Sequence, residues 1–97
     1  MLDTTSVENN RELFEAILSL ETMEECAVFF EDLLTYNELE SVSQRVRAAK
    51  LLLAGKTYEQ IIAETNISSA TLSRVSRCVR YGKGYKTLLS RTEKLES

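Results

Sequence analysis

The sequence contains no histidine, no proline, no tryptophan and only two cysteines, and these absences exclude several kinds of site. Without histidine there is no imidazole base, no Ser-His-Asp triad and no histidine-ligated zinc. The cysteines, Cys26 and Cys78, form no CxxC pair, so neither a thiolate metal site nor a disulfide framework is expected. We therefore expect no metal, no cofactor and no enzymatic activity, because no nucleophile stands beside a titratable partner at recognisable spacing.

Long apolar runs are absent as well. The first ten residues lack the apolar stretch of a signal peptide, and no run approaches the roughly 20 apolar residues that span a bilayer. A cytoplasmic protein without a membrane partner is expected. With 97 residues, 43% apolar and 28% charged, the chain is predicted to form a single domain over residues 1–97. So short a chain buries only about two thirds of its surface, which favours a partner subunit.

The net charge of −3 conceals a strong asymmetry along the chain. Residues 1–40 hold eleven acidic residues and one basic residue, whereas residues 41–97 hold eleven basic and four acidic residues. The first part therefore carries a net charge of −10 and the second +7. A basic face of this kind attracts polyanions, while the acidic part repels phosphate.

Helix signals dominate, since proline is absent and no segment alternates apolar and polar residues for long enough to propose a strand, so an all-α fold is expected. Capping boxes, in which Ser or Thr precedes Glu or Gln by three residues, are predicted at Thr22–Glu25, Thr35–Glu38 and Thr57–Gln60. A flexible tail is expected at residues 1–7, followed by helices at 8–20, 23–34, 36–54 and 58–65. A fifth helix is expected to be capped by Ser68 or Ser69 and to end before Gly82, and a last helix covers 84–95. The helix at 23–34 is predicted to bury Met23, Cys26, Ala27, Phe30 and Leu33.

Residues 57–81 show the pattern of a helix-turn-helix: a short helix, a turn near Asn66 and a second helix. Asn66 suits the turn because asparagine tolerates the left-handed conformation. At about 100° per residue, the second helix places Leu72, Val75 and Val79 on one face. The opposite face carries Ala70, Ser73, Arg74, Arg77 and Arg80, and no acidic residue occurs from 65 to 92.

This pattern predicts DNA binding. The small, uncharged first turn of the second helix leaves the positive end of the helix dipole available to phosphate, and lets the backbone approach a groove. Longer side chains further along can reach guanine edges, and residues at the start of the preceding helix can contact the backbone. The candidate DNA-binding residues are Lys56, Thr57, Gln60, Ser68, Ser69, Ala70, Thr71, Ser73, Arg74 and Arg77. Alternatively, the basic face is a solvated surface, or pairs with the acidic part.

The segments LTYNELESVSQRVRAAKLLLAGKTYEQI and ISSATLSRVSRCVRYG resemble the Trp repressor family, and within it the small TrpR-like branch called YerC or YecD. The segments ELFEAILSL, EEC-x-x-FF-x-DL and RVSRC-x-x-YG extend the resemblance over nearly the whole chain. The resemblance implies a six-helix subunit in an intertwined homodimer, with residues 8–54 as dimerisation helices and 84–95 as the C-terminal helix. Two helix-turn-helix units would then face one side of double-stranded DNA, about one DNA turn apart, over an approximately palindromic operator.

In the Trp repressor itself an indole lies between two arginines near a threonine, and the matching residues here are Arg45, Arg74 and Thr35. The position of the glycine that the ring approaches is occupied by Val75, whose branched side chain is expected to fill the ring's space. Regulation by tryptophan is therefore not expected, while another small-molecule effector and a ligand-independent role both remain open. Arg45 can alternatively pair with an acid such as Glu38 or Glu40.

Two functions remain after this reading of the residues. The leading one is a homodimeric, sequence-specific DNA-binding transcriptional regulator, a repressor by analogy with the family that the chain resembles. The alternative is a protein-interaction module whose acidic N-terminal half docks a partner without DNA.

Overall fold

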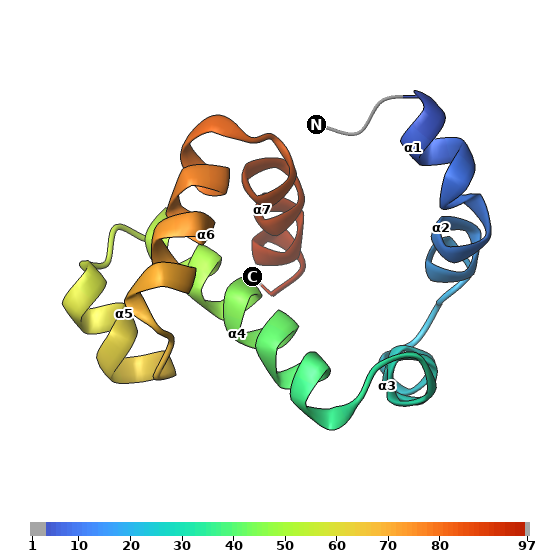
Figure 1. Cartoon of the computed structure of the whole chain (residues 1–97), viewed down its shortest axis with the longest axis horizontal. Helices are drawn as coiled ribbons and strands as arrows, with labels where there is room; N and C mark the ends of the chain where they lie inside the picture. The colour runs from blue at the N-terminus through green and yellow to red at the C-terminus, as the bar shows by residue number, and fades with distance from the viewer. Residues whose placement is uncertain (1–3, 97) are drawn as a thin grey trace. The chain divides into compact units, whose positions relative to one another are not determined.

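This computed structural model describes residues 4–96, with side chains described for residues 6–91. Over that range there are seven helices and no strand, so the predicted all-α fold is confirmed (Figure 1). No helix in the described part is long and apolar enough to cross a membrane. The helices are α1 Thr4–Asn9, α2 Arg11–Leu18, α3 Met23–Leu33, α4 Tyr36–Leu53, α5 Tyr58–Thr65, α6 Ser69–Tyr81 and α7 Gly84–Glu96.

The chain divides into two compact units, residues 1–39 and residues 40–97. The first unit contains α1, α2, α3 and the start of α4. The second contains the rest of α4 together with α5, α6 and α7. Every candidate DNA-binding residue belongs to the second unit, and of the candidate ligand-binding residues only Thr35 belongs to the first.

The N-terminal helix differs from its prediction. One helix over residues 8–20 was expected after a tail, but α1 begins at Thr4 and α2 ends at Leu18. The break lies at Asn10, whose Nδ2 donates to the Ser6 carbonyl over 2.7 Å and whose ψ of 16° leaves helical geometry. An asparagine side chain that bonds to nearby backbone competes with the helix ladder in this way. Residues 4–7 are therefore helical, the helix count is seven rather than six, and residues 1–3 lie outside the described part.

The predicted caps of α3 and α4 are present, and one of them differs in detail. Thr35 and Glu38 form the complete box: the Glu38 N–H donates to Thr35 Oγ1, and the Thr35 N–H donates to Glu38 Oε1. Before α3, the Glu25 N–H donates to Thr22 Oγ1 as expected. The Glu25 carboxylate, however, accepts from the N–H of Glu21 over 2.8 Å rather than from that of Thr22.

The apolar side chains of α2 and α3 are not buried within the single chain. Neither helix contains a buried residue, and Leu18 and Met23 are 84% and 82% exposed. The prediction that α3 buries Met23, Ala27 and Leu33 is therefore wrong for the isolated chain, while Cys26 and Phe30 are half-buried. The described apolar side chains of α2 and α3 therefore form no buried core of their own.

The hydrophobic core belongs to the second unit. Its buried members come from α4, α5, α6 and the turn between α5 and α6: Ala48, Ala49, Leu51, Ile61, Ile67, Leu72 and Val75. The alanines let neighbouring helices approach α4 closely. Helix α4 ends at Leu53, and Gly55 just after it has a φ of 86°, the left-handed conformation of a Schellman cap. The Lys56 N–H donates to the Leu51 carbonyl over 3.0 Å. This sharp end returns the chain so that α5 packs on the same core.

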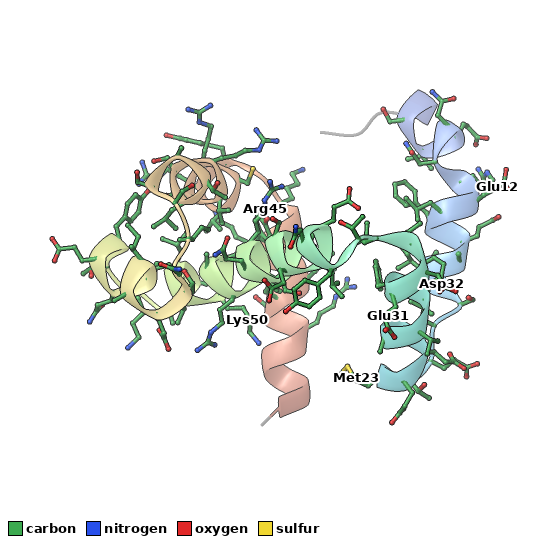
Figure 2. All side chains as sticks on the ribbon, turned by 60° about the horizontal axis from the view of Figure 1, so that its bottom comes forward. Glu12, Met23, Glu31, Asp32, Arg45 and Lys50 are labelled. Atoms are coloured by element: carbon green, nitrogen blue, oxygen red, sulfur yellow. The ribbon has the colours of Figure 1, made fainter. Side chains whose placement is uncertain are left out.

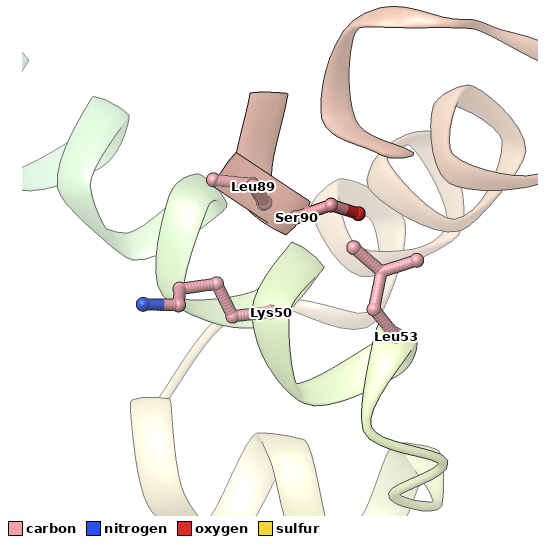
Figure 3. A pocket seen from close by; sticks show the side chains of 4 residues that line it. All are labelled: Lys50, Leu53, Leu89 and Ser90. Carbon is pink, nitrogen blue, oxygen red and sulfur yellow. The ribbon is translucent and has the colours of Figure 1, made fainter. Parts of the chain in front are cut away.

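Helix α7 closes the second unit. Its Tyr85 and Leu89 pack against the core, and Leu89 and Ser90 face Lys50 and Leu53 of α4 around a cavity of about 160 Å³ (Figure 3). The turn into α7 requires glycine at position 82, because a Cβ there would lie 2.6 Å from the Cys78 carbonyl oxygen.

Candidate nucleic-acid interface

Helix α5 begins with the predicted capping box. Thr57 Oγ1 accepts from the Gln60 N–H over 3.2 Å, and Gln60 Oε1 accepts from the Thr57 N–H over 2.9 Å. Both side-chain oxygens are therefore engaged in the cap. The hydroxyl hydrogen of Thr57 and the amide NH₂ of Gln60 are the groups that can still donate to an external acceptor.

The turn between α5 and α6 depends on a left-handed residue, as predicted. Asn66 has φ 62° and ψ 21°, and its N–H donates to the Ile62 carbonyl over 2.8 Å. Thr65 then connects helix and turn, because its hydroxyl donates to the Ile61 carbonyl and accepts from the Ile67 N–H. Ile67 is buried, so the turn is held from the core side as well as by hydrogen bonds.

Two contacts from α4 hold the C-terminal end of α5. Gln44 Nε2 donates to the Thr65 carbonyl over 3.0 Å, and Arg47 Nη2 lies 3.0 Å from Glu64 Oε1. The ion pair is half exposed, so it contributes little stability by itself. Sequence reasoning missed both positioning residues, because the partners are separated by 21 and 17 positions.

Helix α6 begins at Ser68, which resolves the choice between the two serines. Ser68 Oγ accepts from the Thr71 N–H over 3.2 Å and lies 2.9 Å from Thr71 Oγ1. Helix geometry leaves the N–H groups of Ser69 and Ala70 without acceptors inside the helix, and both residues are exposed. The first turn of α6 contains no acidic residue, whereas α2, α3, α4 and α5 each have one or more there.

The two predicted faces of α6 are confirmed. Leu72 and Val75 are 0% and 2% exposed, and Val79 packs partly against the same core. The side chains on the opposite face are exposed: Ala70, Ser73, Arg74, Arg77 and Arg80. Packing of the apolar face thus fixes the direction in which the arginines project.

The α5 candidates lie around a separate hollow. Lys56 and Gln60 line an open depression of about 390 Å³ together with Ala63 and Glu64. The Glu64 carboxylate in this hollow is paired with Arg47 of α4. The pairing lowers the acid's capacity to repel a phosphate that approaches Lys56.

The three candidate ligand-binding residues do not share one unit. Thr35 lies in the first unit, with its hydroxyl engaged in the cap of α4, while Arg45 and Arg74 belong to the second. Arg45 projects from α4 as an exposed side chain (Figure 2). Arg74 is exposed on α6. Val75, which stands where the Trp repressor has glycine, is part of the core.

Known proteins share this sequence pattern and this fold. The family model described as Trp repressor protein matches residues 8–93. The chain belongs to the Trp repressor family. Within that family it groups with the TrpR-like YerC proteins: it is 47% identical over 87 residues to YerC, an uncharacterized protein of Bacillus subtilis (strain 168), covering 89% of this chain and 84% of YerC.

Two crystal structures of Trp-repressor-like proteins share the fold. A candidate Trp repressor from Staphylococcus aureus superposes with a TM-score of 0.87 at 42% identity, over 96% of both chains. A TrpR-like protein from Eubacterium eligens ATCC 27750 superposes with a TM-score of 0.83 at 45% identity, over 95% of this chain and 93% of the other.

Proposed function

We propose that this Trp repressor family member is a sequence-specific DNA-binding transcriptional regulator, and more specifically a repressor that occupies an operator and blocks polymerase. The observation that carries the proposal is the division of α6 into a buried apolar face and an exposed face with three arginines. Helix α6 follows α5 through a tight turn, which is the arrangement that places a recognition helix in the major groove. Membership of a family of DNA-binding regulators supports the same function.

Each candidate residue has a role that its position allows. The exposed N–H groups at Ser69 and Ala70, at the positive end of the α6 dipole, suit a phosphate. Further along the helix, Arg74 and Arg77 can reach guanine edges or phosphate oxygens. Lys56, Thr57, Gln60, Ser68, Thr71 and Ser73 then complete the interface through backbone and groove contacts.

We infer that the active form is a homodimer. The single chain leaves large apolar side chains exposed on α2, α3 and α4, including Leu18, Met23, Val28, Val42 and Val46. So much unpaired apolar surface is characteristic of an interaction face rather than of a free surface. A two-fold dimer presents two copies of α6 about one DNA turn apart, roughly 34 Å, so the operator is expected to be approximately palindromic. Sedimentation equilibrium of the purified chain at micromolar concentration tests this, and a monomer would contradict it.

The acidic first unit favours a second candidate function. Its described side chains include one cation, Arg11, which pairs with Glu8 and Glu15 of the same unit. Other acidic side chains described in that unit, such as Glu12, Glu31 and Asp32 (Figure 2), form no ion pair with a described base of the unit. A basic protein partner, bound without DNA, would fit this charge.

A titration distinguishes the two functions. The wild-type chain is titrated by fluorescence anisotropy against pooled upstream fragments of its own genome at several salt concentrations. Arg77→Ala is expected to cost about 1 to 3 kcal/mol of affinity or discrimination, or about 5- to 150-fold. Arg91→Ala, which removes the same charge from an exposed position on α7, is the control and is expected to bind within about two-fold of wild type.

Fragment-selective binding with a steep salt dependence supports the regulator. Equal losses for both variants would mean that net charge, and not the α6 face, governs binding. If wild type binds no fragment even at low salt, the proposal fails and the protein-partner function is favoured.

A further inference from the structure

A recess on the second unit joins the start of α5 to the C-terminal half of α6. It has a volume of about 200 Å³. Its lining consists of Tyr58 from α5 with Ser73, Ser76, Arg77, Arg80 and Tyr81 from α6. Only Ser73 and Arg77 are among the candidate DNA-binding residues, so the recess extends the candidate interface toward the end of α6.

All six lining side chains carry hydrogen-bond donors and none carries a carboxylate. Arg77 and Arg80 are three positions apart, so their guanidinium groups lie on the same side of the helix. Among the described side chains neither arginine forms an ion pair. Two neighbouring cations among four hydroxyl groups form the environment that a tetrahedral oxyanion such as phosphate requires.

Capping of the C-terminal end of α6 does not by itself explain the presence of Arg80 there. A cation in a last turn often donates to the C-terminal carbonyls, but here two of those carbonyls have other donors. Lys86 Nζ donates to the Arg80 carbonyl over 3.1 Å, and the Gly82 N–H donates to the Cys78 carbonyl over 2.8 Å. The Arg80 guanidinium instead lies over the Tyr81 ring, 6.0 Å from its centroid, at the rim of the recess.

We propose that this recess seats one phosphate of the DNA backbone, with Arg77 and Arg80 as its cationic ligands and Tyr58 at its α5 side. The inference rests on the proposed function, because it adds a contact to the same DNA-binding face. A backbone phosphate fits better than a free one, since Tyr81 and Tyr58 are 77% and 41% exposed. The open rim allows a polymer to continue past the recess on either side.

The test compares Arg80→Gln with wild type on two duplexes, an operator fragment selected by the full chain and a scrambled duplex of the same composition. A phosphate contact carries no sequence information, so the variant is expected to lose the same factor of affinity on both. Its salt slope is expected to be shallower by about 0.9 per subunit. Between 50 and 200 mM salt, this corresponds to a loss of affinity about 3- to 4-fold smaller per subunit than in wild type.

Two variants complete the design. Arg80→Lys keeps the charge and is expected to have most of the wild-type salt slope that Arg80→Gln loses. A merely structural role of Arg80 would not predict this recovery. Lys83→Gln removes a cation just after α6, outside the recess lining, and is expected to leave the slope within error of wild type.

If wild type binds DNA and Arg80→Gln has the same affinity and salt slope, this inference is overturned while the proposed function stands. Loss of discrimination between the duplexes overturns it too, because Arg80 would then read bases. If inorganic phosphate competes with DNA at millimolar concentration while Arg80→Gln binds DNA as wild type does, the recess binds a free anion and the inference is overturned. Failure of wild type to bind either duplex overturns both proposals.

Discussion

The side-chain Nε2 of Gln44 on α4 donates a hydrogen bond to the backbone carbonyl of Thr65, the last residue of α5, over 3.0 Å. The carbonyls of a helix's last turn accept no N–H from the helix itself, so they need a donor from elsewhere. Thr65 also bonds to the Ile67 N–H through its hydroxyl, so one residue links α4, α5 and the turn. The half-buried Gln44 amide therefore adds a hydrogen bond to the apolar packing that positions α5 and α6 on α4.

Replacing that amide is expected to destabilise the helix-turn-helix. Gln44→Leu keeps the approximate side-chain size but leaves the Thr65 carbonyl without its donor, at a cost of about 1 kcal/mol, and up to about 3 if water does not replace the donor. Urea denaturation followed by circular dichroism measures the change. Ser43→Ala, on the exposed side of the same helix, is the control, and an equal loss there would contradict the assigned role.

The turn makes a second prediction. Asn66 has a φ of 62°, which glycine adopts freely and alanine adopts only at a cost. Asn66→Ala is therefore expected to lower the free energy of unfolding by about 1 kcal/mol, whereas Asn66→Gly is expected to be close to neutral. Thermal melts of the pair measure the difference. If both variants are equally stable, the backbone at position 66 is not left-handed in solution.

Adjacent serines allow a third prediction with its own matched control. Ser68 caps α6 by accepting from the Thr71 N–H, whereas Ser69 is the first residue inside the helix. Ser68→Ala is expected to cost about 1 kcal/mol, within the usual range for a lost N-cap, and Ser69→Ala to cost almost nothing. Chemical denaturation of both variants distinguishes them, and a reversed order would move the start of α6 by one residue.

A fourth prediction concerns tryptophan. Val75 is buried in the core at the position where the Trp repressor has the glycine that the indole approaches. Its branched side chain agrees with the expectation from the sequence that tryptophan is not the effector, so saturating L-tryptophan is expected to leave operator affinity unchanged. Anisotropy titrations with and without the amino acid measure this. A shift of ten-fold or more in affinity would show that an indole site survives despite Val75.

Local sequence signals were sufficient for the helix-turn-helix. The limits of α5, the left-handed Asn66 and the two faces of α6 were predicted, and the structure confirms them. The cap of α6 was predicted at Ser68 or Ser69, and the structure has it at Ser68. Each depends on hydrogen bonds or side-chain spacing within one or two helical turns, so neighbours in sequence determine them. The break at Asn10 was missed although it too is local, because a continuous helix and a side-chain bond to Ser6 differ little in free energy.

Contacts between helices were decided by the tertiary structure alone. Gln44 meets Thr65 and Arg47 meets Glu64 only because α4 and α5 pack around the buried Ile61. Tyr58 of α5 meets Arg77 and Arg80 of α6 at one recess because α5 and α6 pack on the same core. By itself the sequence determined which residue types lie on each helix face. How those faces meet depends on crossing angles and on which side chains fill the core, and neither can be read from spacing along the chain.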